Sequence, residues 1–441
     1  MPPPEEPGPP SGKFGAAPPV RSASGAALML LGAAVLACSM WFFVARVWAP
    51  PLESHLSDLY PRWYGSRELL VHHRDPYSPA VTTEIQTLSY GGAVHPGESR
   101  DEERFAYPLY IALLLAPTVG LPFARVESLF RFILPVLALL SVFLWVRMLG
   151  WRCPKATLGV LILLSLGSFP VLESIYLEQP ALLAGALLAG AGAALAAGRL
   201  GLAGALLAVA TIKPQLSVPL VIWLLVWACW DWRSRKKLVW GFGLTLLVLG
   251  GVSELLLPGW AREFLAGLTA YQQYTGNFSI LTLLFSHLGG AFAGLGLAGA
   301  LAVVLWQVRH ESAGSDRFNY GLVIVLTVTV VVMPTLYPTS QVVLLPAIFL
   351  LLKNRQQVWA AGRARRLGWV AVFSLIAWPW VGSFAYLLAS LAVPLSSLRR
   401  LWIVPVASIL LIPLAVLVML AALDPSALGV IPPAQVSAAN R

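Results

Sequence analysis

One carboxylate near the N-terminus has the residue type and the setting expected of a catalytic base. Asp58 lies in the polar stretch HLSDLYPRWYGSRELL, shortly after the first apolar run. A carboxylate beside a bilayer can have a raised pKa and accept a proton from a hydroxyl group. The alternative is that Asp58 caps the N-terminus of the short helix that follows it, because Asp is a preferred N-cap residue. The sequence leaves both interpretations open.

A single cation, Lys213, lies between two apolar runs in AVATIKPQLSVP and has no basic neighbours. Pro214 and Pro219 favour a broken helix at this point, and broken helices often line a cavity. An ammonium group at such a break would suit a phosphate group. Alternatively, its long side chain reaches the outer lipid headgroups by snorkelling.

Polar residues between the apolar runs complete the set of candidates for binding a charged, hydroxyl-rich ligand. Glu173, Glu178 and Gln179 form one such group, in which a carboxylate either orients an acceptor hydroxyl or is simply solvated in a loop. Asp75 lies in HHRDPYSP, whose Asp-Pro and Ser-Pro steps indicate a turn. The remaining candidates for substrate binding are Arg74, Tyr77, Tyr271, Asn277 and Gln341.

Cofactor and metal chemistry have little support in the sequence. His72 and His73 are adjacent and lack a suitably spaced carboxylate, which makes them a weak signal for a metal site. The chain has no Walker A motif, no dinucleotide fingerprint and no zinc-protease motif. We therefore predict neither a metal nor a cofactor, and we expect any activated substrate to arrive in the membrane.

The elements that position these residues must be membrane helices. Of the 441 residues, 58% are hydrophobic and only 11% are charged, whereas soluble chains carry about 25% charged residues. The apolar runs are rich in Leu, Ala and Val without strand-like alternation, so the sequence predicts an all-α polytopic membrane protein with about 10 to 13 transmembrane helices. The runs are 26–44, 129–146, 181–197, 216–230, 238–257, 291–308, 321–332, 342–352, 370–391 and 401–422.

The positive-inside rule gives a topology and explains the net charge of +10 without nucleic acid. Basic clusters near residues 147–155, 233–237 and 353–366 are expected on the cytoplasmic side. This arrangement predicts a disordered, Pro/Gly-rich cytoplasmic tail at 1–24, a transmembrane domain at 25–422 and a cytoplasmic tail at 423–441. Residues 49–127 then form one large extracytoplasmic loop with interfacial helices. The run 107–119 is short for a crossing and is interpreted as interfacial, although a crossing stays open.

Four segments resemble glycosyltransferase family 87, which comprises membrane mannosyltransferases of the GT-C fold that use a polyprenyl-phosphate-linked sugar. They are the Ser57–Pro79 loop, FAYPLYIALLLAP at 105–117, LEQPALL at 177–183 with the stretch that ends in IKP at 214, and the loop 257–279. Their order and spacing make the match moderately specific. One departure is PTLYPTSQVVLLP at 334–346, where many relatives have a Trp and a His and this chain has Gln341 in about that place.

The resemblance implies a mechanism and a location. Asp58 would be the general base that deprotonates an acceptor hydroxyl, Lys213 would steady the donor phosphate, and Gln179 would contact sugar or acceptor. The implied partners are a polyprenyl-phosphate sugar donor, a lipid or glycan acceptor and membrane lipids. The expected enzyme transfers a hexose, with mannose as the leading sugar and with inversion, at the extracytoplasmic face of a bacterial cytoplasmic membrane.

Two other functions are compatible with the sequence. A transporter or flippase for lipid-linked sugars would also combine many helices with scattered polar groups. Such a carrier should have ionisable residues near the middle of several helices, whereas here they cluster at the predicted outer ends. A non-catalytic membrane scaffold is the third possibility, and it predicts that substituting Asp58 by Asn leaves function intact.

Overall fold

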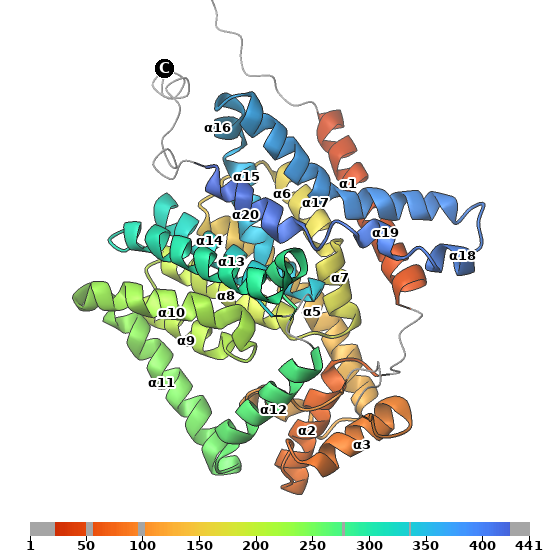
Figure 1. Ribbon diagram of the computed structural model, residues 1–441, viewed down its shortest axis with the longest axis vertical. Coiled ribbons are helices and arrows are strands. Elements are labelled where there is room, and N and C mark those ends of the chain that lie inside the picture. The colour runs from red at the N-terminus through yellow and green to blue at the C-terminus, as the bar shows by residue number, and fades with distance from the viewer. Residues whose placement is uncertain (1–22, 50–55, 96–101, 276–277, 335–336, 424–441) are drawn as a thin grey trace, which may run out of the picture.

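The computed structural model describes residues 23–49, 56–95, 102–275, 278–334 and 337–423, and every regular element in these ranges is helical (Figure 1). The prediction of an all-α polytopic membrane protein is confirmed. The predicted tails at 1–24 and 423–441 fall almost entirely outside the described residues, so the expectation that they are disordered stays a prediction.

Five helices are long and apolar enough to cross a membrane, or six if the bent pair α6 (Lys155–Leu166) and α7 (Phe169–Tyr176) forms one span. The five are α1 with its π-helical extension η1, then α5, α11, α13 and α17. They cover Ser24–Trp48, Phe123–Met148, Trp232–Leu256, Ile280–Gln307 and Arg363–Ala389.

The number of full-length spans is smaller than the sequence predicted because several apolar runs are divided into shorter helices. Five apolar segments of 10–17 residues are α8 (Ala181–Ala196), α9 (Leu200–Ala210), α10 (Pro214–Trp230), η3 with α15 (Pro338–Lys353) and α20 (Ile412–Ala421). At a rise of about 1.5 Å per residue, even the longest is shorter than the roughly 30 Å hydrocarbon core. Hydropathy alone counted these pieces as crossings.

The remaining helices connect and cover these segments. They are α12 (Trp260–Thr275), α14 (Asp316–Val332), α16 (Arg355–Ala360), α18 (Leu395–Arg399) and α19 (Ile403–Val406). Helix α14 is buried along nearly its whole length, and its N-terminus is capped by Ser315, whose side chain accepts a hydrogen bond from the Phe318 amide. Helix α13 is interrupted at Ser286, where φ is +66°.

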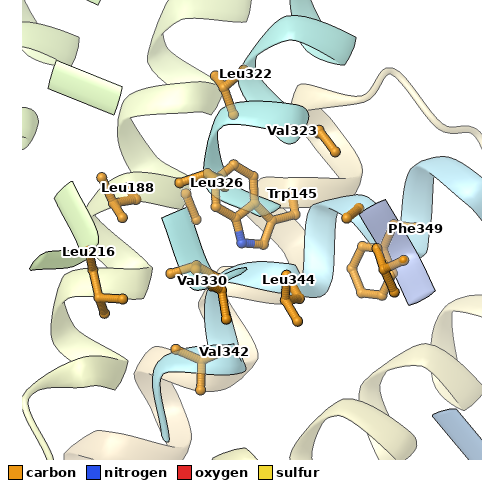
Figure 2. Packing of buried hydrophobic residues seen from close by; sticks show 14 of the residues in the cluster. Trp145, Leu188, Leu216, Leu322, Val323, Leu326, Val330, Val342, Leu344 and Phe349 are labelled. Atoms are coloured by element: carbon orange, nitrogen blue, oxygen red, sulfur yellow. The ribbon is translucent and has the colours of Figure 1, made fainter. Parts of the chain in front are cut away.

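The main core lies where α5, α8, α10, α14, η3 and α15 converge. Figure 2 shows the indole of Trp145 from α5 among aliphatic side chains of α8, α14 and η3. Trp145 is 1% exposed. The segments that carry Glu173, Gln179 and Lys213 have neighbouring residues in this core, which fixes their relative positions.

The first loop region is a folded unit with a second hydrophobic core. Its helices are α2 (Leu59–His72), α3 (Pro79–Tyr90), α4 (Ile111–Leu115) and the 3-10 turn η2 (Ala116–Thr118). Leu59, Trp63, Ile85 and Phe105 are among its buried residues, and Val126 at the start of α5 packs with them. Helix α4 has five residues, too few to cross a membrane, and it packs on α2. No candidate membrane span lies in 107–119, and the interfacial interpretation of this segment stays a prediction.

Local sequence explains the boundaries of these loop helices. Ser78 caps α3 by accepting a hydrogen bond from the Val81 amide, and Pro79 occupies its first turn. Helix α3 ends at Gly91 with φ +79°, a left-handed conformation that glycine adopts without steric cost. In Figure 1 the α2–α3 unit lies at the opposite end of the molecule from α16.

Candidate active site

The carboxylate of Asp58 faces another segment of the chain and does not cap α2. Asp58 occupies the N-cap position of α2, yet its side chain makes no capping hydrogen bond. Its Oδ2 instead accepts a hydrogen bond from Nε2 of Gln179, which lies between α7 and α8. Its backbone amide donates to the carbonyl oxygen of Leu177 at 3.1 Å. The capping interpretation is thus correct for the backbone position and wrong for the side chain.

Gln179 connects Asp58 to Lys213. The Lys213 Nζ donates to Gln179 Oε1 at 3.2 Å, while the other end of the same amide donates to Asp58. Lys213 lies in the three-residue break between α9 and α10, and its residue is only 5% exposed. Because the ammonium group is buried among protein atoms, the snorkelling interpretation of Lys213 is wrong.

Burial shifts the pKa values of Asp58 and Lys213 in opposite directions. Asp58 keeps partial solvent access but is densely surrounded by protein, and this desolvation raises the pKa of its carboxyl. Arg62, Lys213 and the Gln179 hydrogen bond act the other way on that pKa. Desolvation likewise lowers the pKa of the Lys213 ammonium below its ordinary value. A carboxylate with a raised pKa is a stronger base, which suits proton abstraction from a hydroxyl group.

A cation and an aromatic ring lie beside this trio. Arg62 follows Asp58 by one helical turn, its guanidinium stacks over the Tyr107 ring at 4.4 Å, and its Nη2 donates to the Tyr107 hydroxyl at 3.2 Å. The Tyr77 hydroxyl donates to the Tyr107 carbonyl oxygen at 2.7 Å. Tyr110 forms a 2.7 Å hydrogen bond with the Thr211 hydroxyl, next to the break that holds Lys213.

Glu173 adds a second buried carboxylate to the same cluster. It lies on α7, is 6% exposed, and interacts electrostatically with both Asp58 and Lys213. The Thr339 amide donates a hydrogen bond to it. Among the described residues, its Oε2 has no hydrogen-bond partner. Buried polar atoms are nearly always hydrogen-bonded, so an unpaired carboxylate oxygen beside Asp58 and Lys213 is suited to receive a ligand hydroxyl.

Several sequence candidates have structural partners away from this cluster. Asp75 forms the turn expected of it, since its Oδ1 accepts from the Tyr77 amide at 2.8 Å. Arg74 pairs with Glu68 and Glu84. The Gln341 side chain is buried and donates to the Ile409 carbonyl oxygen at 2.8 Å. Asn277 and the side chain of Tyr271 lie outside the described residues.

Some members of the cluster were not predicted as site residues. Arg62 could have been found, because it lies four residues after Asp58 and α-helical spacing brings such residues to one face. Ser57 donates a hydrogen bond to Glu178 at 2.7 Å, and Arg131 lies 3.4 Å from the same carboxylate. Neither residue could be found from the sequence, because these contacts join residues far apart in the chain. Within the described ranges, no three His, Cys, Asp or Glu side chains come together as a metal site.

A family model supplies the comparison with known proteins. The model of glycosyltransferase family 87 matches residues 105–334, just over half of the chain. The chain belongs to glycosyltransferase family 87. No curated protein and no solved structure gives a significant match.

Family 87 membership and the apolar helices together make this chain a membrane glycosyltransferase. The matched range includes Tyr107, Glu173, Gln179 and Lys213 of the cluster. Asp58 and Arg62 precede it, and the structure brings them to the matched part through the Asp58–Gln179 contact. A general base and a fixed cation are two groups that can promote transfer of a sugar to a hydroxyl group.

Proposed function

We propose that this family 87 enzyme transfers a hexose, with mannose as the leading sugar, from a polyprenyl-phosphate donor to a hydroxyl of a lipid or glycan acceptor. The reaction takes place at the extracytoplasmic face of a bacterial cytoplasmic membrane and inverts the anomeric centre. The observation that carries this proposal is the chain of contacts Asp58–Gln179–Lys213, which joins a base to a phosphate-compatible cation.

The proposed step is one displacement. Asp58 accepts the proton of the acceptor hydroxyl, and the oxygen attacks the anomeric carbon of the donor sugar. The bond between that carbon and the phosphate oxygen breaks, and polyprenyl phosphate leaves with the electron pair. Attack from the face opposite the leaving group inverts the configuration. The Lys213 ammonium stabilises the charge that develops on the phosphate, where a fixed cation in a poorly solvated site is most effective.

The neighbouring residues have supporting roles in this proposal. The free Oε2 of Glu173 accepts a hydrogen bond from a sugar or acceptor hydroxyl. Arg62 is a second cation for the donor phosphate, and Tyr107, which the guanidinium covers, keeps that cation in place. Gln179 holds Asp58 and Lys213 at a fixed separation, so that base and cation act on one substrate geometry.

Sugar transfer by the purified protein in nanodiscs tests the proposal. Radiolabelled polyprenyl-phosphate mannose is supplied with a membrane-lipid extract as acceptor pool. Wild type is compared with Asp58→Asn, which keeps the shape of the side chain, and with Lys213→Met. We expect Asp58→Asn to lower kcat by roughly 10²- to 10⁴-fold, the range for loss of a general base. Lys213→Met should lower kcat as well, because the leaving phosphate loses its cation.

Three other outcomes would each contradict a different part of the proposal. Transfer that survives Asp58→Asn would contradict the role of Asp58 as base while keeping the enzyme activity. Product retaining the donor's anomeric configuration would contradict the single displacement. Absence of transfer from every polyprenyl-phosphate sugar, together with movement of labelled donor between leaflets, would favour a carrier.

A further inference from the structure

Two short segments hold each other through three successive contacts around Asp58. The Ser57 hydroxyl donates to Glu178 Oε2 at 2.7 Å. The Asp58 amide donates to the Leu177 carbonyl oxygen at 3.1 Å, and Gln179 donates to the Asp58 carboxylate. Three consecutive residues, 177–179, therefore hold residues 57–58 through hydrogen bonds. Of the two side-chain contacts, the one to Glu178 has no role in the proposed reaction.

The backbone at Glu178 shows that this arrangement is built at a conformational cost. Glu178 has φ +53°, one of three positive-φ residues other than glycine in the described ranges. A glycine would adopt the left-handed conformation more easily but would carry no carboxylate. The conformation lets Glu178 reach Ser57 while its two neighbours contact Asp58. Backbone strain of this kind persists where the surrounding contacts over-determine it, commonly at functional sites.

We propose that Glu178 is a positioning residue whose carboxylate holds Ser57 and thereby aims the adjacent Asp58 at the reacting hydroxyl. The proposal rests on the proposed role of Asp58 as base. Glu178 acts through Ser57 and does not touch the substrate. A small displacement of a catalytic group is enough to lower the rate of a reaction strongly. The Ser57–Glu178 hydrogen bond therefore controls the chemical step by fixing the position of Asp58.

The charges around Glu178 make the Ser57–Glu178 hydrogen bond sensitive to pH. The residue is 1% exposed, and its Oε1 lies 3.4 Å from Nε of Arg131 on α5, which also pairs with Glu127. Burial is the main reason that the pKa of Glu178 is raised to about 7; Glu127 also raises this pKa, whereas Ser57 and Arg131 lower it. Asp58, Arg62, Glu173 and Lys213 are the other charged groups of the adjoining cluster. Below this pKa the carboxylate is neutral and accepts the Ser57 hydrogen bond less strongly.

A double-mutant cycle separates positioning from substrate contact. Transfer is measured with monodisperse Ser57→Ala, Glu178→Ala and the double variant. We expect each single variant to lower kcat by about 10- to 100-fold with little change in the donor KM. The double variant should be no slower than the slower single variant, because both remove one interaction. Additive losses, or a rise in donor KM alone, would overturn the proposal.

The conservative variant supplies a readout that a purely structural role would not move. Glu178→Gln keeps an oxygen that accepts from Ser57 but cannot titrate. It should recover most of the wild-type kcat and lose the change in kcat that we expect for wild type near pH 7. Asp231→Asn, which removes an exposed carboxylate at the start of α11, is the matched control and should keep that change. An unchanged profile in Glu178→Gln would contradict the proposal.

Amide hydrogen exchange tests the Ser57–Glu178 hydrogen bond without any transfer assay. The Asp58 amide is hydrogen-bonded to Leu177, so exchange of a peptide covering residues 57–60 should accelerate in Glu178→Ala and stay as in wild type in Asp231→Asn. Unchanged exchange in Glu178→Ala would overturn the proposal.

Inactive Asp58→Asn combined with fully active Glu178→Ala would remove the inference and keep the proposed function. Absence of wild-type transfer would remove the proposed function, and with it the positioning role, whatever the exchange rates show.

Discussion

Asp58 and Lys213 carry pKa shifts of opposite sign from the same cause, and the rate of transfer should report both. Burial raises the pKa of Asp58, so the ionised base is lost as pH falls, and at a higher pH than for an ordinary Asp. Burial lowers the pKa of Lys213, so the ammonium is lost as pH rises, below the usual lysine range. We expect a bell-shaped dependence of kcat/KM on pH.

The Lys213→Arg variant checks the assignment of the alkaline limb. A guanidinium stays protonated throughout the accessible range, so the variant should lose that limb and keep the acid limb. Steady-state kcat/KM measured in overlapping buffers, with stability confirmed at each pH, provides the test. An alkaline limb that persists in Lys213→Arg would show that another group causes it.

Sequence reasoning identified the residue types at the site but not their orientation. Asp58, Gln179 and Lys213 were selected because charged and amide groups between apolar runs are costly unless they have partners. Whether Asp58 capped a helix and whether Lys213 reached the lipid could not be decided. The first depends on the Asp58–Gln179 contact, between residues 121 positions apart, and the second on the Lys213–Gln179 contact, between residues 34 positions apart. No local pattern encodes either contact. Gln341 shows the reverse case, since its polar amide satisfies the Ile409 carbonyl oxygen within the fold.

At the scale of elements, α9 and α11 pack so closely that glycines are required at their contact. A Cβ added to Gly241 would lie 2.1 Å from the Gly201 carbonyl oxygen, and a Cβ on Gly204 would lie 2.1 Å from that of Leu238. Small residues let membrane helices approach in this way. Gly241→Ala should destabilise the protein by about 1–3 kcal/mol, because a backbone atom must move.

A neighbouring glycine on the same helix provides the control for this prediction. A Cβ on Gly243 would meet nothing within 4 Å, so Gly243→Ala should be neutral or slightly stabilising through helix propensity. Thermal unfolding in detergent, followed by loss of the monodisperse peak, compares the two variants. Equal stability of Gly241→Ala and Gly243→Ala would contradict the close α9–α11 contact.

Helix existence followed from the sequence better than helix length did. The apolar runs at 129–146 and 370–391 correspond to α5 and α17, which are long enough to cross. The run at 401–422 is divided between α19 and α20, and the run at 342–352 between η3 and α15. Hydropathy does not record such breaks, because the residues on both sides of a break are equally apolar. Tertiary packing decides whether the backbone stays helical.

At the scale of the whole molecule, the helices α2–α4 form a unit with its own hydrophobic core, which we call the cap (residues 56–118 of the described chain). The cap packs against a larger helical core. The α2–α4 unit packs around Trp63 and Phe105, whereas α5, α8 and α14 pack around Trp145. The site lies where the two meet, since Asp58 and Arg62 belong to the cap and Lys213 to the helical part. Sequence reasoning predicted a large polar loop but not its core. Because Asp58 belongs to the cap, the side of the membrane on which the cap lies determines which leaflet can present the donor to Asp58.

The orientation of the cap can be tested with single cysteines in intact cells. The three native cysteines, Cys38, Cys153 and Cys229, are replaced by Ser or Ala, and activity is confirmed first. Thr87→Cys on an exposed part of α3 should react with a membrane-impermeant maleimide, because the predicted topology puts residues 49–127 outside. Arg365→Cys, exposed at the start of α17, should react only after the membrane is permeabilised. The reverse pattern would put Asp58 on the cytoplasmic side, and a donor presented in the outer leaflet could then no longer be its substrate.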